Sequence, residues 1–321
     1  MNATPERFRR AAKLTVVGTG LVGSTAAYSI LARGLVSEIV LIDINRQRAE
    51  GEAMDLNHAA PFGRPVRVRA GDYPDAEGSD IIIVAAGAAQ KAGESRLSLA
   101  KTNVEIIRQI APRLHEAAPE AVVLIVSNPV DILTHAAQKV SGYPVERVIG
   151  SGTLLDTARF RFELANRCQV APANVHAYII GEHGDTEVPV WSLANIAGMR
   201  LRDYCPVSGR GCDDGELRDL FENVKNAAYE VIARKGATYY AIALGVTRLA
   251  EAILRDENAV MTVSTLVDGY YGIRDVCLSL PAVVCRQGIR EVIPLKLADA
   301  EVQALRHSAE TLRRVLDSVG L

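Results

Sequence analysis

A glycine-rich turn near the N-terminus constrains this chain more than any other feature. Residues 14–23 read Leu-Thr-Val-Val-Gly-Thr-Gly-Leu-Val-Gly, and the apolar run 39–42 ends at Asp43, twenty residues after the last glycine. A Gly-x-Gly-x-x-Gly turn between two apolar runs, the second ending in an acid, is typical of a strand–helix–strand unit that binds a dinucleotide. The glycines alone would be weak evidence, but this placement makes the pattern specific.

Each part of the motif has a physical role. Gly18 allows the tight turn, Gly20 lets the backbone approach a pyrophosphate, and Gly23 lets the helix pack close to the strand. The helix start at Leu21 and Val22 offers free N–H groups and a positive dipole end to the phosphates. Asp43 would accept hydrogen bonds from the ribose hydroxyls and repel a 2′-phosphate, which favours NAD over NADP. The alternative is an ordinary parallel-sheet turn with chance glycines.

Composition and charge argue against several classes of protein. The 321 residues carry a formal net charge of −2, which argues against nucleic-acid binding through phosphate attraction. No apolar run approaches the ~20 residues that span a bilayer, so we expect no membrane contact. Residues 1–11 predict a flexible tail rather than a secretory signal. The five cysteines form no Cys-x-x-Cys pair, which favours a reducing cytoplasm over a disulfide framework and predicts no metal site.

The first half of the chain alternates short apolar runs with helical patterns. Continuous Val/Ile runs predict strands buried on both faces, as in a parallel sheet. We therefore expect an α/β, doubly wound (Rossmann) NAD-binding domain over residues 12–150. The predicted strands are Leu14–Gly18, Ile39–Asp43, Val66–Ala70, Ile81–Ala85, Val122–Ser127 and Val148–Ile149. The predicted helices are Val22–Arg33, Arg46–Ala60, Ser98–Ala117 and Ile132–Val140.

The second half has a different order of elements and predicts an α+β substrate domain over residues 151–321, with the boundary near Gly150–Gly152. We expect residues 205–214 to form a polar loop. The predicted helices are Asp156–Arg167, Leu217–Lys235, Thr238–Leu254 and Asp299–Val319. The predicted strands are Val175–Ile180, Val260–Leu266, Val276–Val284 and Ile289–Val292.

Several motifs together resemble the NAD-dependent L-lactate and malate dehydrogenase family, over nearly the whole chain. The chain is most similar to the bacterial L-lactate dehydrogenases of that family. The resemblance implies reversible hydride transfer between NADH and pyruvate, giving L-lactate and NAD, the last step of homolactic fermentation. The segments that carry it are 18–23, 87–96, 127–131, 155–159, 181–185 and 236–240, in addition to Asp43.

The resemblance assigns the proton transfer to His183, which lies in Gly-Glu-His-Gly-Asp. Histidine suits this role because it titrates near neutral pH. Asp156 matches the carboxylate that orients the imidazole, although its place also suits a helix N-cap. Arg159, one helical turn further on, matches the residue that binds the substrate carboxylate with two hydrogen bonds. The alternatives are a structural histidine and an ordinary surface arginine.

A loop over residues 89–95 is expected to close over the substrate and to bring in Arg96, which polarises the reacting oxygen. Asn128 would hold that oxygen and the nicotinamide edge; its alternative role is a turn residue. Gln90 would face the substrate side chain, where its neutral amide leaves the second carboxylate of oxaloacetate without a partner and favours pyruvate. Thr238 would line the same small pocket.

The resemblance also implies further ligand contacts. NAD would touch a set of residues at the strand ends and helix starts: Gly18, Gly20, Leu21, Val22, Gly23, Asp43, Arg48, Gly87, Ala88, Ser127, Asn128 and Ser151. Arg161 and His176 match the positions at which bacterial relatives bind fructose 1,6-bisphosphate across a subunit interface, and the family implies a homotetramer. The alternative is that Arg161 and His176 have only structural roles.

Two other functions stay open at this point. A malate dehydrogenase, or a dehydrogenase of another 2-hydroxy acid, would share the fold and the acid–base pair, and Gln90 argues against the first. A dinucleotide-binding protein without catalytic activity would share the fold alone. That class predicts the loss of His183, Asp156 or Arg159, and the sequence has all three.

Overall fold

The computed structural model describes residues 11–88, 96–209 and 213–321. Its centre is a sheet whose first six strands are parallel and lie in the order β3-β2-β1-β4-β5-β6. This order reverses direction next to β1, which places a crevice at the carboxyl ends of β1 and β4. The strands are β1 (Lys13–Val17), β2 (Glu38–Ile42), β3 (Arg67–Ala70), β4 (Ile81–Val84), β5 (Val122–Ile125) and β6 (Val148–Gly150).

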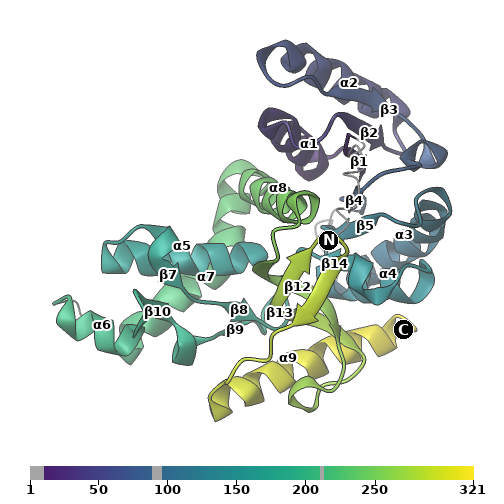
Figure 1. Cartoon of the computed structure of the whole chain (residues 1–321). Coiled ribbons are helices and arrows are strands. Elements are labelled where there is room, and N and C mark those ends of the chain that lie inside the picture. The colour runs from purple at the N-terminus through teal and green to yellow at the C-terminus, as the bar shows by residue number, and fades with distance from the viewer. Residues whose placement is uncertain (1–10, 89–95, 210–212) are drawn as a thin grey trace, which may run out of the picture.

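Helices cover both faces of this sheet (Figure 1), as the doubly wound prediction requires. One face packs against α1 (Leu21–Arg33), α2 (Arg46–Ala59) and α8 (Tyr240–Arg255). The other face packs against α3 (Arg96–Ala117), α4 (Val130–Val140) and α9 (Asp299–Ser318).

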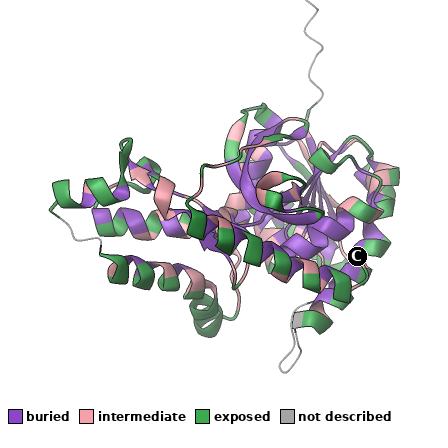
Figure 2. Cartoon of the chain, turned by 90° about the horizontal axis from the view of Figure 1, so that it is seen from below, coloured by how far each residue is buried: buried purple, intermediate pink, exposed green. Residues whose placement is uncertain are grey.

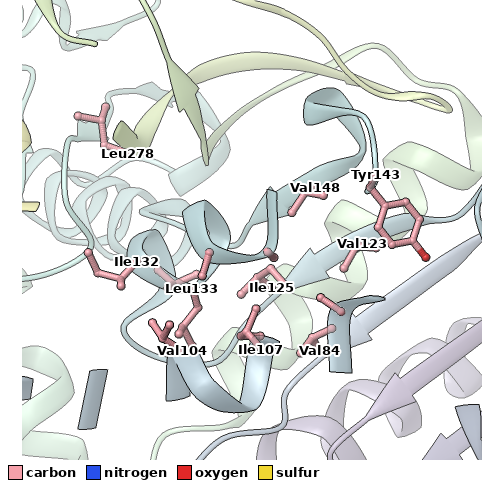
Figure 3. Packing of buried hydrophobic residues seen from close by; sticks show 14 of the residues in the cluster. Val84, Val104, Ile107, Val123, Ile125, Ile132, Leu133, Tyr143, Val148 and Leu278 are labelled. Carbon is pink, nitrogen blue, oxygen red and sulfur yellow. The ribbon is translucent and has the colours of Figure 1, made fainter. Parts of the chain in front are cut away.

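Alternate residues of each parallel strand supply the two cores, because successive side chains point to opposite faces. Ile81 and Ile83 of β4 pack with the α1 side, whereas Ile82 and Val84 pack with the α3 side. Figure 3 shows Val84, Val123 and Ile125 facing side chains of α3 and α4. Both faces of these strands are therefore buried, which explains their continuous apolar sequence.

Three antiparallel strands of the second half extend the same sheet. They are β12 (Ala259–Val267), β13 (Val276–Cys285) and β14 (Gly288–Val292), and β12 pairs with β6 through Ser264 and Gly150. A Cβ added at Gly150 would lie 2.3 Å from the Thr134 hydroxyl, so only glycine fits at this junction. The sheet therefore runs without a break past the predicted boundary near residue 150.

The rest of the second half projects from the sheet as helices and short ribbons (Figure 1). The helices are α5 (Leu154–Cys168), α6 (Leu201–Val207) and α7 (Asp214–Lys235). The short strands are β7 (Val175–His176), β8 (Ile179–Ile180), β9 (Val188–Pro189), β10 (Asn195–Ile196) and β11 (Met199–Arg200). Figure 2 shows buried residues concentrated around the central sheet and exposed residues along these projecting helices.

Three sequence expectations are wrong in this part. The strand predicted over residues 175–180 is two strands in different sheets, because β7 pairs with β10 and β8 with β9. The polar loop predicted from Cys205 begins later, since α6 extends to Val207 with Pro206 inside it. The cysteine pattern favoured a reducing environment over a disulfide framework, but Cys205 is disulfide-bonded. Cys168, Cys277 and Cys285 are buried, and Cys277 and Cys285 are free. Within the described ranges, no helix is long and apolar enough to cross a membrane.

Candidate active site

A cleft of about 790 Å³ lies at the carboxyl ends of β1, β2 and β4. Six of the predicted cofactor residues line it: Gly18, Gly20, Asp43, Arg48, Gly87 and Ala88. Tyr73 and Arg113, which sequence reasoning missed, line it as well, and the Arg113 guanidinium lies 3.7 Å from the centre of the Tyr73 ring. The other predicted cofactor residues lie outside its described lining: Leu21, Val22, Gly23, Ser127, Asn128 and Ser151.

The glycine turn has the geometry that a dinucleotide requires. Gly18 has a φ of +95°, and a Cβ there would lie 2.5 Å from the Ala86 nitrogen. A Cβ on Gly23 would lie 1.9 Å from the Gly18 oxygen, whereas the space around Gly20 is open to 4 Å. The tight turn and the close helix–strand packing predicted from these glycines are confirmed. The open space at Gly20 leaves room for a pyrophosphate beside the N-terminus of α1.

Asp43, at the end of β2, is fixed by the turn that follows β1. Its Oδ2 accepts hydrogen bonds from the Thr19 N–H (2.7 Å) and hydroxyl (2.9 Å), and its Oδ1 accepts one from the Asn45 N–H (2.8 Å). Burial raises the pKa of Asp43, but these hydrogen bonds outweigh it and hold the pKa below its ordinary value. The carboxylate is therefore charged and positioned, with remaining acceptor capacity for ribose hydroxyls.

Asn103, a buried residue of α3, joins two loops at the strand ends. Its Oδ1 accepts a hydrogen bond from the Ala88 N–H (2.8 Å), and its Nδ2 donates one to the Asn128 carbonyl oxygen (2.7 Å). Ser127 also donates its hydroxyl proton to the Ala86 carbonyl (2.6 Å). Sequence reasoning missed Asn103, whose only signal is one amide among the apolar positions of a helix.

Three side chains of α5 and the loop after β8 form the chemical centre. The His183 Nδ1 lies 2.5 Å from the Asp156 Oδ2, and the Asp156 Oδ1 accepts a hydrogen bond from an Arg159 terminal nitrogen at 2.8 Å. Asp156 lies in the first turn of α5, but the residue at the N-cap position is Thr153. The N-cap alternative for Asp156 is therefore wrong, and its carboxylate holds both partners instead.

The charge of Asp156 controls the titration of His183. The Asp156 carboxylate raises the pKa of His183 to about 9, against the lowering effect of burial. Burial raises the pKa of Asp156, but His183 and Arg159 outweigh burial and hold it below its ordinary value. The side chains of His183 and Arg159 remain 27% and 18% exposed, so a small ligand can reach both. With Nδ1 directed at Asp156, the His183 Nε2 is left to exchange a proton with that ligand.

Comparisons with known proteins decide the family. A model of the lactate/malate dehydrogenase NAD-binding domain matches residues 12–150, and a model of the family's alpha/beta C-terminal domain matches residues 153–320. The chain belongs to the lactate/malate dehydrogenase family. The predicted family, the doubly wound fold and the NAD cofactor are thereby confirmed.

Individual members of this family are similar over nearly their full lengths. L-lactate dehydrogenase 1 of Clostridium acetobutylicum is 51% identical over 312 residues, which cover 97% of this chain and 100% of that protein. The L-lactate dehydrogenase of Acetivibrio thermocellus is 53% identical over 310 residues, covering 96% and 98%. A crystal structure of the minor L-lactate dehydrogenase of Enterococcus mundtii superimposes with a TM-score of 0.93 at 42% identity, covering 97% and 99%.

The remaining predicted site residues of this lactate/malate dehydrogenase chain lie on several different elements, and one falls outside the described residues. Asn128 is exposed after β5, in a cis peptide bond with Pro129, and Ser151 is buried after β6. Thr238 is half-buried between α7 and α8. Gln90 lies outside the described residues, and of Arg96 the structure gives only its place at the start of α3.

A further acid beside the triad was missed by sequence reasoning. Glu187 is 9% exposed, and its Oε1 has no hydrogen-bond partner among the described residues. Burial, and then repulsion from Asp156, raise the pKa of Glu187 to about 8. It is therefore largely neutral at pH 7 and adds little negative charge near His183.

The two residues predicted to bind an effector lie close together on the projecting part of the fold. The Arg161 Nε donates a hydrogen bond to the carbonyl of Ala177 (2.9 Å), the residue after His176. His176 is exposed on β7, and Arg161 is partly buried with its guanidinium 5.2 Å from the centre of the Tyr178 ring. Within the described residues, no cluster of His, Cys, Asp and Glu could hold a metal ion.

Proposed function

We propose that this member of the family reduces pyruvate to L-lactate with NADH, reversibly. The observation that carries the proposal is the His183–Asp156–Arg159 triad, which combines an acid–base group with a cation for a carboxylate. The relatives that match nearly end to end are named L-lactate dehydrogenases, which supports the same reaction. NADH supplies the hydride when it is bound.

His183 supplies the proton in the proposed direction. Because its pKa is raised to about 9, the imidazole is protonated at neutral pH and can donate from Nε2 to the carbonyl oxygen of pyruvate. In the reverse direction the neutral imidazole takes the hydroxyl proton of lactate. Asp156 stabilises the imidazolium in both directions and fixes the ring orientation.

Arg159 binds the substrate carboxylate in this proposal. Its guanidinium is held by Asp156 from one side and is still 18% exposed, so its remaining N–H groups can bind a carboxylate. A lysine cannot form the same planar pair of hydrogen bonds. Arg96, from the start of α3, is proposed to polarise the reacting oxygen, and Asn128 is proposed to bind that oxygen.

Pyruvate rather than oxaloacetate is the proposed substrate because Gln90 offers no positive charge to a second carboxylate. The test is NADH oxidation by the full chain with pyruvate or oxaloacetate at matched concentrations. A large preference for pyruvate supports the proposal, whereas a preference for oxaloacetate replaces it with malate dehydrogenase activity. NADH binding without turnover of either would favour a protein without catalytic activity.

An effector site and a tetramer complete the proposal. Arg161 and His176 are proposed to bind fructose 1,6-bisphosphate together with a second subunit. A fall in the Michaelis constant for pyruvate when the bisphosphate is added tests this proposal.

Large apolar side chains stand exposed on the adjacent helices α1 and α8, where Tyr28 is 55% and Tyr240 67% exposed. Such a surface fits a subunit contact, and light scattering should give four times the 34.5 kDa chain mass. The proposed location is the cytoplasm, which the free thiols of Cys277 and Cys285 favour, although the disulfide of Cys205 does not.

A further inference from the structure

A buried carboxylate outside the triad joins three separate segments of the fold. Asp131 lies in the first turn of α4 and is only 2% exposed. Charged side chains are almost never buried to this extent unless they are paired. The partners of Asp131 therefore indicate what its burial is for.

Both oxygens of Asp131 accept hydrogen bonds from other segments. The Oδ2 accepts one from the His183 backbone N–H at 2.8 Å, and the Oδ1 accepts one from the Ser264 hydroxyl at 2.5 Å. Ser264 belongs to β12, and it is the residue that pairs with Gly150 of β6. Asp131 thus ties the loop of His183 to α4 and to the centre of the sheet.

The position of α4 gives this link a consequence for the reaction. The helix begins directly after the Asn128–Pro129 peptide, at the carboxyl end of β5. Asn128 and His183 are the residues proposed to contact the same substrate oxygen. The hydrogen bond from the His183 backbone N–H to Asp131 links the His183 loop to the first turn of α4. It therefore fixes the distance between His183 and Asn128.

Asp131 also contributes charge. Burial raises the pKa of Asp131 to about 6, which leaves the carboxylate ionised at neutral pH. After the larger effect of Asp156, the negative charge of Asp131 helps to raise the pKa of His183. Three other charged side chains face Asp131, His183 or the neighbouring Glu187. They are Arg159 of α5, Lys225 of α7 and Glu182 of the loop that carries His183.

We propose that Asp131 is a positioning residue of the active site, which fixes the His183 loop on α4 and places a second negative charge behind the imidazolium. This inference rests on the proposed function, since it assigns Asp131 a part in the same reaction. It predicts two separable effects, one from the geometry of the hydrogen bonds and one from the charge.

Asp131→Asn separates these effects. The asparagine oxygen can still accept from the His183 N–H, and its amide can donate to the Ser264 hydroxyl, so the geometry is kept while the charge is lost. We expect the alkaline limb of the pH profile for pyruvate reduction to move ~1 unit toward lower pH. Below that limb, kcat should stay within about threefold of the wild type, because the hydrogen bonds persist.

Asp131→Ala removes both effects, so it should show the same shift and a plateau kcat at least about tenfold lower. Asp317→Asn is the matched control. Asp317 is an exposed acid of α9 paired with Arg313, and its loss should not move the limb. If Asp131→Asn does not fold, Asp131→Ser replaces it as a smaller neutral side chain with the same expected shift.

An Asp131→Asn enzyme whose alkaline limb coincides with the wild type overturns the inference. Failure of the proposed function gives a different result, because the wild-type chain would then not reduce pyruvate at all. In that case an NMR titration of the His183 Cε1 proton, assigned with His183→Asn, still tests the charge effect. A lower His183 pKa in Asp131→Asn supports the inference, and an equal pKa overturns it.

Discussion

Removal of the Asp156 charge should change the pH dependence of the reaction more than any other single substitution. The ordinary pKa of histidine is 6.5, and Asp156 is the largest cause of the rise to about 9 at His183. A rise of this size corresponds to about 3 kcal/mol in favour of the imidazolium. In Asp156→Asn we expect the His183 pKa to return to 6.5 or below, because the lowering effect of burial remains.

The size of the kinetic effect follows from the protonated fraction. At pH 7.5, a histidine with a pKa near 9 is almost fully protonated, whereas one near 6.5 is about one-tenth protonated. Pyruvate reduction by Asp156→Asn should therefore be at least about tenfold slower at pH 7.5, and the difference should shrink at pH 5.5 as both enzymes become protonated. Any loss that remains at pH 5.5 measures the effect of Asp156 on ring orientation and on Arg159.

The assay is kcat/KM for pyruvate across pH 5–10, with saturating NADH and with Asp317→Asn as the matched control. The alkaline limb of Asp156→Asn should lie at least about two units below that of the wild type. Limbs at the same pH in the two enzymes would refute the reasoning, because the charge of Asp156 would then not govern His183.

Three further predictions concern the same site. Arg159→Lys should raise KM for pyruvate at least about tenfold with a smaller change in kcat, since one planar pair of hydrogen bonds is lost; an unchanged KM would show that Arg159 does not bind the carboxylate. Glu187→Gln should leave kcat/KM at pH 6.5 close to the wild type, because the acid is already neutral there; a tenfold loss at that pH would contradict a neutral Glu187. Folding raises the pKa of His183, so its contribution to stability is present below pH 6.5 and is lost as the pH rises through about 9. The free energy of unfolding in urea should be measured for the wild type and for His183→Asn across this pH range. The difference between the two proteins should fall by at most about 3 kcal/mol as the pH rises. A difference that does not change with pH would exclude this contribution.

The parts of the fold that follow from local sequence could be predicted. The turn at Gly18 and the acid at Asp43 lie within one strand–helix–strand unit, where spacing alone fixes their relation. The buried parallel strands were predicted from continuous apolar runs, such as 81–84, which pack on both faces. The fold class followed from the same alternation of strands and helices, and the observed order of the parallel strands is of the doubly wound type.

Relations between distant segments could not be predicted in the same way. The pairing of Gly150 with Ser264 joins residues far apart in sequence, and no local pattern encodes it. Residues 175–180 form a mostly apolar run that looks like one strand in the sequence, but the structure divides it between two sheets. In the site, His183 and Asp156 depended on the family resemblance. Asp131 ends one of the segments that carry this resemblance, 127–131, but nothing in the sequence indicated its hydrogen bonds to the His183 loop and to Ser264. Glu187 had no signal at all, because the sequence alone does not distinguish a buried acid from a surface acid.

The most direct test of the account compares wild type and His183→Asn for NADH binding and for pyruvate reduction. NADH binding, followed by fluorescence, should be the same in both proteins, because the cleft at Gly18, Gly20 and Asp43 is unchanged. Pyruvate reduction should fall by about two to four orders of magnitude, the range expected for loss of general acid catalysis. A His183→Asn protein that reduces pyruvate as fast as the wild type would contradict the central claim.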